Sequence, residues 1–252
     1  MVAIDELVAY TDSLLQVEDF RDYCPNGLQV AGRGEVRRLI SGVTASQALI
    51  DAAVAAGADA LLVHHGWFWK GEDPRVIGIR RQRLATLLAH DISLLAYHLP
   101  LDAHPRLGNN VRLGELLGWE AAGRFGRGEG PDLALWGRLP AALTPAGLAA
   151  RLTEVLGHPA LHLPGGGEVI ERIGWCTGAA QSWLEAAAGL GLDAFVSGEV
   201  SEPTAHLARE LGIHYFAAGH HATERYGVQA LGVHLAEKFK LEHEFIDLYV
   251  PV

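Results

Sequence analysis

A strand–helix–strand pattern occurs in both halves of this chain, and this repeat constrains the fold more than any other feature. In the first half, Gly42-Val-Thr44 ends a predicted strand, a helix follows, and Gly57-Ala-Asp-Ala-Leu-Leu-Val63 contains the next strand. In the second half, Trp175-Cys-Thr177, a helix and Gly191-Leu-Asp-Ala-Phe-Val196 repeat that order. Each copy continues into a helix and a third strand, as in parallel βαβ units. We therefore predict an α/β protein of two similar α/β units related by an internal repeat.

The predicted strands are 39–43, 60–63 and 92–97, then a strand beginning near 169, 191–196 and 213–218. The predicted helices of the first half are 4–15, 46–56 and 77–89.

The segment between the two copies has a different character. Residues 125–130 are rich in glycine and polar residues, which is typical of a linker, and a strand is predicted over 133–139. Thr144-Pro145 is a helix-start signal, a capping residue followed by proline, and predicts a helix to 156. We predict a main α/β domain of residues 1–124 plus 200–252 and a smaller second α/β domain of residues 125–199.

Composition excludes several classes of protein. The formal net charge of −10, from 20 Lys and Arg against 30 Asp and Glu, makes nucleic acid an unfavourable partner. The two cysteines have no paired spacing, which argues against a thiolate zinc site and favours a reducing compartment. The acidic, amphipathic start is unlike a signal peptide, and the longest apolar stretch is too short to span a bilayer. We expect a cytoplasmic protein that does not enter a membrane.

Histidines and carboxylates follow three of the predicted strands. The strings are His64-His65-Gly66, His98-Leu-Pro-Leu-Asp102 and His220-His221-Ala-Thr-Glu224. Sites in open α/β sheets form at the carboxyl ends of strands, so these three ends are expected to meet in one place. The sequence therefore predicts a metal site at the strand ends between the two units.

The spacing within each string does not decide which of its residues share one site. Neighbouring strand residues point to opposite faces, so His64 and His65 share a site only if the chain has already left the strand, which Gly66 permits. His220 and Glu224 lie one turn apart if a helix begins near them. Asp102 stands at the same spacing from His98, but Pro100 lies between them and favours a loop.

The kinds of candidate ligand narrow the choice of metal ion. Imidazole and carboxylate without thiolate suit Zn, Fe, Mn, Co or Ni. There are more candidate ligands than one zinc needs, and five or six suit two divalent metals joined by a bridging carboxylate.

These strings, with Asn26-Gly-Leu-Gln-Val30, Gly42-Val-Thr-Ala-Ser46 and Ser197-Gly-Glu199, resemble the family of GTP cyclohydrolase 1 type 2 homologues, and its short bacterial members above all. The resemblance spans nearly the whole chain and is weakest over 123–169. It implies a toroidal homohexamer with a dinuclear metal centre in each chain. It also implies metal ligands at His64, His65, Asp102, His220 and Glu224, with Glu224 bridging both metals, and a site-lining role for His98.

The family name implies hydrolytic ring opening of a nucleotide, and a divalent metal can lower the pKa of water to about 7. His98 or Glu199 would then shuttle the proton. A phosphate loop is missing from the sequence, so Arg80, Arg81 and Arg225 are the candidates for an anion clamp, against the alternative of solvated helix faces. The aromatic run Trp67-Phe-Trp69 would either wall the site or pack against a second subunit.

Two functions therefore stay open. One is a metal-dependent hydrolase of a small cyclic or nucleotide-like substrate. The other is a non-catalytic, metal-stabilised hexameric adaptor or regulator.

Overall fold

The protein forms two compact units in a computed structural model that describes residues 1–126 and 131–252. Unit 1 comprises residues 1–107 and 227–248, and unit 2 comprises residues 108–226 and 249–252. These boundaries differ from the predicted domains because the strand over 214–217 pairs with the strand over 194–197, so residues 200–226 belong with the second sheet. Of the predicted linker, residues 127–130 lie outside the described part of the chain.

Unit 1 is built on a five-stranded sheet of order β13-β4-β5-β6-β2. Strands β13, β4, β5 and β6 are parallel to their neighbours, and β2 is antiparallel to β6. A long helix, α9, begins in unit 2 and ends in unit 1. The elements of unit 1 are β1 (Val2–Ala3), α1 (Ile4–Leu15), a short 3-10 helix (Val17–Asp19), β2 (Gly27–Val30), β3 (Glu35–Val36), β4 (Arg38–Thr44), α2 (Gln47–Ala55), β5 (Ala60–His65), α3 (Gly78–Ala89), β6 (Ser93–Ala96), α4 (Leu99–Ala103), the later part of α9 (His220–Phe239) and β13 (Glu242–Phe245).

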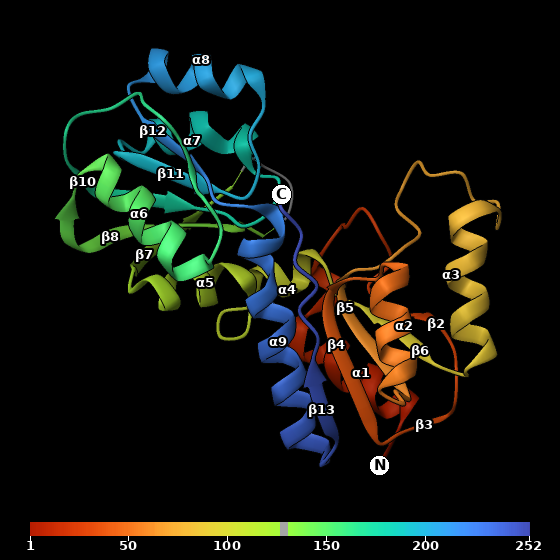
Figure 1. Ribbon diagram of the computed structural model, residues 1–252. Coiled ribbons are helices and arrows are strands. Elements are labelled where there is room, and N and C mark those ends of the chain that lie inside the picture. The colour runs from red at the N-terminus through yellow and green to blue at the C-terminus, as the bar shows by residue number, and fades with distance from the viewer. Residues whose placement is uncertain (127–130) are drawn as a thin grey trace. The chain divides into compact units, whose positions relative to one another are not determined.

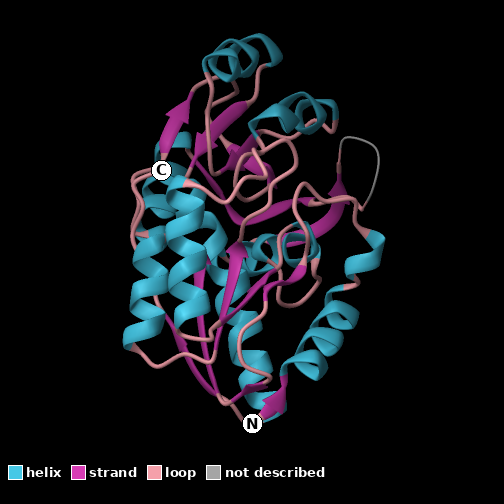
Figure 2. Cartoon of the chain, turned by 90° about the vertical axis from the view of Figure 1, so that its right-hand side faces the viewer, coloured by secondary structure: helices cyan, strands magenta, loops and turns pink. Residues whose placement is uncertain are grey.

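Helices cover both faces of this sheet, which explains why its central strands are apolar throughout (Figures 1 and 2). On one face, Leu49 of α2 and Leu87 of α3 pack with Leu61 of β5. On the other face, Leu7 of α1 and Leu231 of α9 belong to a second cluster with Leu62, the neighbour of Leu61 on β5, whose side chain points to the opposite side of the sheet. The sheet is thereby buried on both sides, and its strand ends are the places where polar side chains emerge.

Unit 2 holds a six-stranded sheet of order β7-β8-β10-β11-β12-β9. Strands β10, β11 and β12 are parallel, while β7, β8 and β9 join antiparallel. Helices α5 and α6 contribute to the hydrophobic cluster of one face, and α7 and α8 to that of the other. The elements of unit 2 are α5 (Asn109–Leu117), β7 (Glu120–Phe125), β8 (Ala134–Leu143), α6 (Pro145–Leu156), β9 (Leu161–Leu163), β10 (Ile170–Trp175), a 3-10 helix (Gln181–Trp183), α7 (Leu184–Gly189), β11 (Ala194–Ser197), α8 (Glu202–Leu211), β12 (His214–Ala217) and the start of α9.

The predicted internal repeat is present in the two sheets. Strands β4, β5 and β6 correspond to β10, β11 and β12, with the same parallel order. The aspartate of the shared Gly-x-Asp-Ala string has the same structural role in each copy. Asp59 accepts the backbone N–H groups of Arg37 and Arg38, and Asp193 accepts those of Glu171 and Arg172. A repeated carboxylate that accepts the backbone N–H groups at the start of the first strand explains why this string recurs.

No helix of residues 1–126 and 131–252 combines the length and apolar character that crossing a bilayer requires.

Candidate metal centre

The carboxyl end of β5 places two histidine rings side by side. Strand β5 includes both His64 and His65, contrary to the expectation that the chain leaves the strand before them. Pairing with β6 ends at Val63, so beyond that point the strand is held only through β4. The two rings are 4.5 Å apart between centroids, with the planes tilted by 45°. His64 is fully buried and His65 is half-buried.

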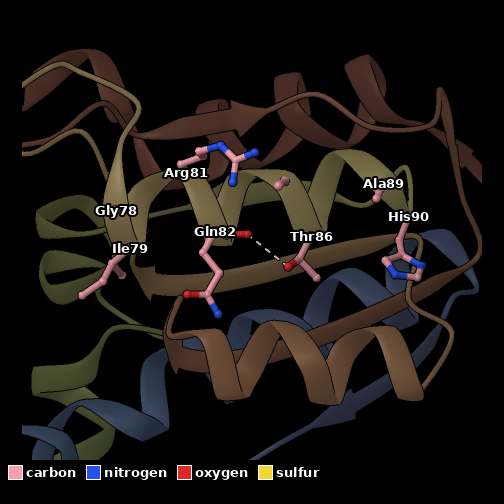
Figure 3. A pocket seen from close by; sticks show the side chains of 8 residues that line it. Gly78, Ile79, Arg81, Gln82, Thr86, Ala89 and His90 are labelled. Atoms are coloured by element: carbon pink, nitrogen blue, oxygen red, sulfur yellow. Dashed lines mark hydrogen bonds between the residues drawn. The ribbon is translucent and has the colours of Figure 1, made fainter.

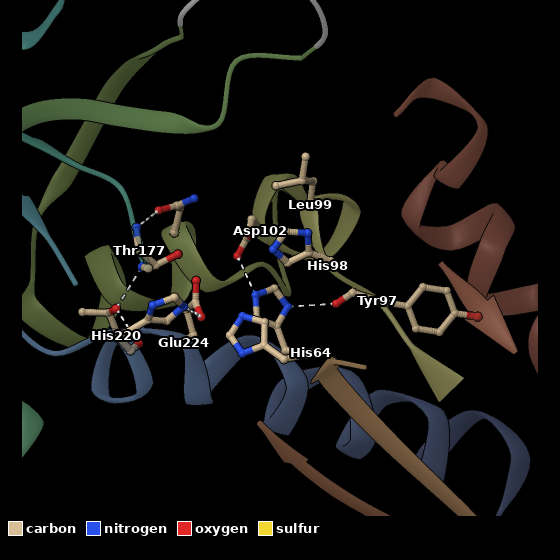
Figure 4. Close-up of polar contacts among 12 residues, drawn as sticks. His64, Tyr97, His98, Leu99, Asp102, Thr177, His220 and Glu224 are labelled. Atoms are coloured by element: carbon tan, nitrogen blue, oxygen red, sulfur yellow. Dashed lines mark hydrogen bonds and ion pairs between the residues drawn. The ribbon is translucent and has the colours of Figure 1, made fainter. Parts of the chain in front are cut away.

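The end of β6 adds a third histidine and a carboxylate to this cluster. The ring of His98 lies 5.2 Å from that of His64 and 5.8 Å from that of His65. The three residues offer donor atoms within 4.8 Å of one another. The predicted loop is instead the short helix α4, because proline is accepted in the first helical turn. From α4, the Asp102 carboxylate approaches His64 Nε2 at 3.5 Å (Figure 4).

In unit 2, His220 and Glu224 form a pair on the first turn of α9. The helix begins at His220, which meets the condition for the two residues to lie one turn apart, and His220 Nε2 lies 2.9 Å from Glu224 Oε2 (Figure 4). Gly178, whose φ is +67°, lies against this pair, and a Cβ atom at that position would collide with Glu224 Oε1. Glu224 is buried, so its charge is held in a poorly solvated place.

The histidines of both units share one orientation. Their Nδ1 atoms face protein oxygen atoms: Tyr97 O for His64 (2.9 Å), Asp22 Oδ1 for His98 (2.7 Å) and Glu199 Oε1 for His220 (2.7 Å). Carbonyl and carboxylate oxygens only accept, so these three Nδ1 atoms carry a proton, and in a neutral ring Nε2 then keeps the lone pair. His220 Nε2 faces the Glu224 carboxylate and is protonated as long as the ring is an imidazolium. His65 Nδ1 faces the hydroxyl of Thr44 at 3.1 Å. Metal-binding histidines in proteins are typically oriented in this way.

The electrostatics of unit 2 favour a cation at His220. Burial opposes a positive charge there, but the hydrogen bond and charge of Glu224, and then those of Glu199, outweigh it and raise the pKa of His220 to about 9. A site that stabilises imidazolium so strongly offers the same negative charge to a metal ion.

The structure assigns further roles to several predicted residues. Glu199, predicted as a proton shuttle, contacts His220 directly. Arg80 pairs with Glu72, and Arg225 donates to the Leu156 carbonyl, so both are engaged within their own units. Trp69 lies 5.0 Å from the His98 ring and walls the cluster. Trp67 is buried in its own unit and donates to Ala45 O.

Helix α3 carries two surface hollows that are separate from the histidine cluster. The first has a volume of about 820 Å³, and Figure 3 draws the side chains of α3 that line it. The second has a volume of about 590 Å³ and includes Trp67, Arg75, Arg80 and Arg83 in its lining. Neither is lined by a predicted metal ligand. The first is lined by Gly78, Ile79, Arg81, Gln82, Ala85, Thr86, Ala89 and His90.

Sequence reasoning missed the groups that hold the histidines. Asp22, Thr44 and the Tyr97 carbonyl contact His98, His65 and His64. Asp22 is 76 residues from its partner, so no local spacing reveals the contact. The position of Thr44 directly after a predicted strand was a usable signal, since this strand end lies beside that of β5.

The chain matches the model of the Duf34/NIF3 (NGG1p interacting factor 3) family over residues 2–250. It is 55% identical over 250 residues to a Pseudomonas aeruginosa protein named GTP cyclohydrolase 1 type 2 homolog, covering 99% of each chain. An Escherichia coli K12 protein of the same name is 50% identical over 247 residues, with 98% of each chain covered.

Solved structures agree with this relationship. The solved structure of protein ybgI is 48% identical to this chain, with a TM-score of 0.96 and full coverage of both chains. TTHA1606 from Thermus thermophilus is 34% identical with a TM-score of 0.90, again over both whole chains. The architecture described above is therefore shared along the entire length of these relatives.

Proposed function

Because this chain belongs to the Duf34/NIF3 family, we propose that it binds two divalent metal ions and hydrolyses a small cyclic or nucleotide-like substrate. The observation that carries the proposal is the gathering of imidazole and carboxylate donors at the strand ends, where His64, His65 and His98 offer ligand atoms within 4.8 Å of one another and protein oxygens fix the Nδ1 atoms of His64, His98 and His220. The name that the Pseudomonas aeruginosa and Escherichia coli relatives bear supports the nucleotide-like class of substrate.

In this proposal the residues that would hold the metal ions are those that the resemblance to the family implies, namely His64, His65, Asp102, His220 and Glu224. The donor set fits divalent metals of the Zn, Fe, Mn, Co and Ni group, because it consists of imidazole and carboxylate. His64, Asp102 and Glu224 are buried, which is where a charged ligand set needs a cation for compensation. Bound divalent metals would supply Lewis acidity.

The chain's own residues would then bind, orient and move protons. Glu199 holds His220 through Nδ1, which keeps Nε2 directed at Glu224. His98 stands beside His64 and His65 with a lone pair on Nε2, so it is suited to accept a proton from an attacking water. Trp69 covers one side of the His98 ring and limits access of bulk water to it.

We further propose that the protein acts in the cytoplasm as a homohexameric ring, as its resemblance to the family implies. Val76, Ile77 and Ile79 support an interaction role for the region before and within α3, since these apolar side chains are all exposed by more than half. The same observation favours the second candidate function, a metal-stabilised adaptor without catalysis. Nucleic acid is not proposed as a partner, given the net charge of −10.

The deciding experiment measures bound metal and turnover on the same samples. Protein purified without chelator and reloaded with each candidate metal is expected to hold two equivalents per chain. A panel of nucleotides and cyclic amides is then assayed from pH 8 to 4.5. We expect activity to fall at a higher pH than the metal is released, because a divalent metal lowers the pKa of water only to about 7, whereas metal competition keeps the ligands deprotonated to a lower pH.

The outcomes separate the two functions. Saturation at one equivalent would reject the dinuclear site. Two bound metals without turnover of any panel member, in a particle of about six times 27.1 kDa by light scattering, would favour the adaptor.

A further inference from the structure

Asp22 is a buried carboxylate that the predicted ligand set does not use. It lies in the loop between the first 3-10 helix and β2, with a side chain only 3% exposed. One oxygen accepts from His98 Nδ1 at 2.7 Å and from the Tyr23 backbone N–H at 2.6 Å. The other accepts from the Leu99 backbone N–H and from Asn26 Nδ2, both at 2.9 Å. Four donors therefore converge on this single side chain.

The same loop also fixes the backbone of His98. Asn26 Oδ1 accepts the His98 backbone N–H at 2.7 Å, so Asp22 and Asn26 together hold this residue by its ring and by its main chain. Burial alone would raise the pKa of Asp22, but the hydrogen bond and charge of His98, followed by the hydrogen bond from Asn26, lower it below the ordinary value. Asp22 consequently stays ionised and can only accept.

An ionised Asp22 decides which nitrogen of neutral His98 carries the proton. Nδ1 must be the donor, so Nε2 keeps the lone pair. His98 itself belongs to the cluster in which His64, His65 and His98 each offer one ligand atom within 4.8 Å of the others. The edge-on packing of Trp69 against the His98 ring, at 89° between planes, further restricts its rotation.

Cys24 also lies near this pair, and it does not compete for the proton. Burial, and then the charge of Asp22, raise the pKa of the Cys24 thiol to about 12. The thiol is therefore protonated at neutral pH, and the dyad is a carboxylate and an imidazole. Unit 2 contains the same arrangement, in which Glu199 holds His220 Nδ1 at the same 2.7 Å.

We propose that Asp22 is the positioning residue that fixes His98 in the Nδ1–H tautomer, so that Nε2 accepts a proton at the candidate site. In the step concerned, Nε2 takes the proton of an attacking water, the ring becomes imidazolium, Asp22 remains ionised, and the proton then passes from Nε2 to the leaving group. The catalytic part of this inference rests on the proposed function, whereas the tautomer does not.

The test compares Asp22→Asn with the wild type in metal-free protein at pH 8. Solid-state ¹⁵N NMR of protein labelled at the histidine rings reads the protonation of each nitrogen in an assembly of any size. A His98→Gln variant identifies the His98 signals by their loss. In the wild type we expect a protonated Nδ1 and an unprotonated Nε2. In Asp22→Asn the amide cannot accept from both His98 and Leu99, so the signals should move towards a mixture of tautomers.

Asp59→Asn is the matched control, because Asp59 is another buried carboxylate of unit 1 that accepts backbone N–H groups but contacts no histidine ring in the described contacts. It should lose stability and leave the His98 signals in place. A protonated Nε2 in the wild type, or an unchanged His98 in folded Asp22→Asn, would overturn the tautomer assignment.

Metal content and turnover complete the test. Asp22→Asn should retain two metals per chain and lower kcat by about 100-fold or more, with a smaller change in KM. If Asp22→Asn loses metal as His64→Ala does, His98 belongs to the ligand set and the proton-acceptor role fails. If the wild type binds fewer than two metals or turns over no substrate, the proposed function fails. The NMR spectra still test the tautomer of His98, because they do not depend on metal binding or turnover.

Discussion

The two units present the same chemical string after their third parallel strand, yet they fold it differently. His98 and Asp102 follow β6, and His220 and Glu224 follow β12, each pair four residues apart. In unit 2 the helix starts at the histidine, so both residues are helical and meet at 2.9 Å. In unit 1 His98 precedes α4 with φ −99° and ψ −110°, and Asp102 approaches His64 instead. The position of the helix start therefore determines which partner the carboxylate reaches.

A second difference lies in the carboxylates that hold Nδ1. Asp22 is 3% exposed and receives four hydrogen bonds, whereas Glu199 is 43% exposed. Removing Asp22 should therefore disturb the surrounding backbone as well as a ring. Glu199 is closer to a pure orienting group, since solvent can replace much of what it offers.

The strongest test of this comparison asks whether the two histidine–carboxylate sets serve one centre. Glu224→Gln keeps the size of the side chain and removes the charge, so metal affinity should fall by roughly 10–100-fold or more. If both units supply one dinuclear centre, both metal equivalents weaken together. Equilibrium dialysis with elemental analysis measures the two affinities.

Glu202→Gln is the control for that substitution. Glu202 makes an exposed pair with His206 at the same four-residue spacing, 2.7 Å apart, on α8. It should leave both affinities unchanged. Loss of a single equivalent in Glu224→Gln, with the other unaffected, would mean that each unit binds its own metal.

The glycine beside Glu224 allows a second test. Gly178→Ala places Cβ against Glu224 Oε1 at a φ of +67°, so both sterics and backbone strain oppose it. We expect a loss of about 1–3 kcal/mol in the free energy of unfolding, together with weaker metal binding. Gly189→Ala in α7 meets nothing within 4 Å and should be neutral or slightly stabilising. Urea unfolding with and without metal measures both variants. Equal free energies of unfolding for Gly178→Ala and Gly189→Ala would contradict the proposed collision with Glu224.

The raised pKa of His220 gives a third test, in metal-free protein. Its folded pKa of about 9 lies above the unfolded value of about 6.5. The imidazolium therefore stabilises the fold fully below pH 6.5, and this contribution is lost as the pH rises from 6.5 through 9. Urea unfolding in the presence of a chelator should show the decline, and Glu199→Gln should reduce it. Metal added at pH 8 should release a proton from His220, which an indicator dye detects.

How far the sequence predicted these features depends on the range of the contacts. The repeat was visible because Asp59 and Asp193 serve the same local purpose within matching strings. The four-residue spacing of His220 and Glu224 likewise indicated that the two would meet if a helix began near them, and α9 begins at His220. The helix over α4 was missed because Pro100 was given more weight as a helix breaker than as a first-turn residue.

Contacts between distant segments set the limit. The boundary predicted at residue 199 cuts through a sheet, because β12 pairs with β11 and β9 and no composition change marks that pairing. Asp22 could not be assigned for the same reason, since a loop near the start of the chain meets the end of β6 only in the folded unit.

The smallest expected effect tests whether the two units are separate in stability as they are in architecture. Ser46 caps α2 in unit 1 by accepting from the Leu49 backbone N–H, and Thr144 caps α6 in unit 2 by accepting from that of Gly147. Replacing either by alanine should cost about 1 kcal/mol, because one N–H group at the helix start loses its acceptor. Urea unfolding is followed by the NMR signals of histidines in unit 1 and of Trp175 in unit 2. If the units unfold independently, Ser46→Ala lowers the unfolding midpoint of the unit 1 signals only, and Thr144→Ala lowers that of the Trp175 signal only. Helix α9 runs through both units, so a single shared transition that moves equally in both variants would show that this helix couples them into one cooperative fold.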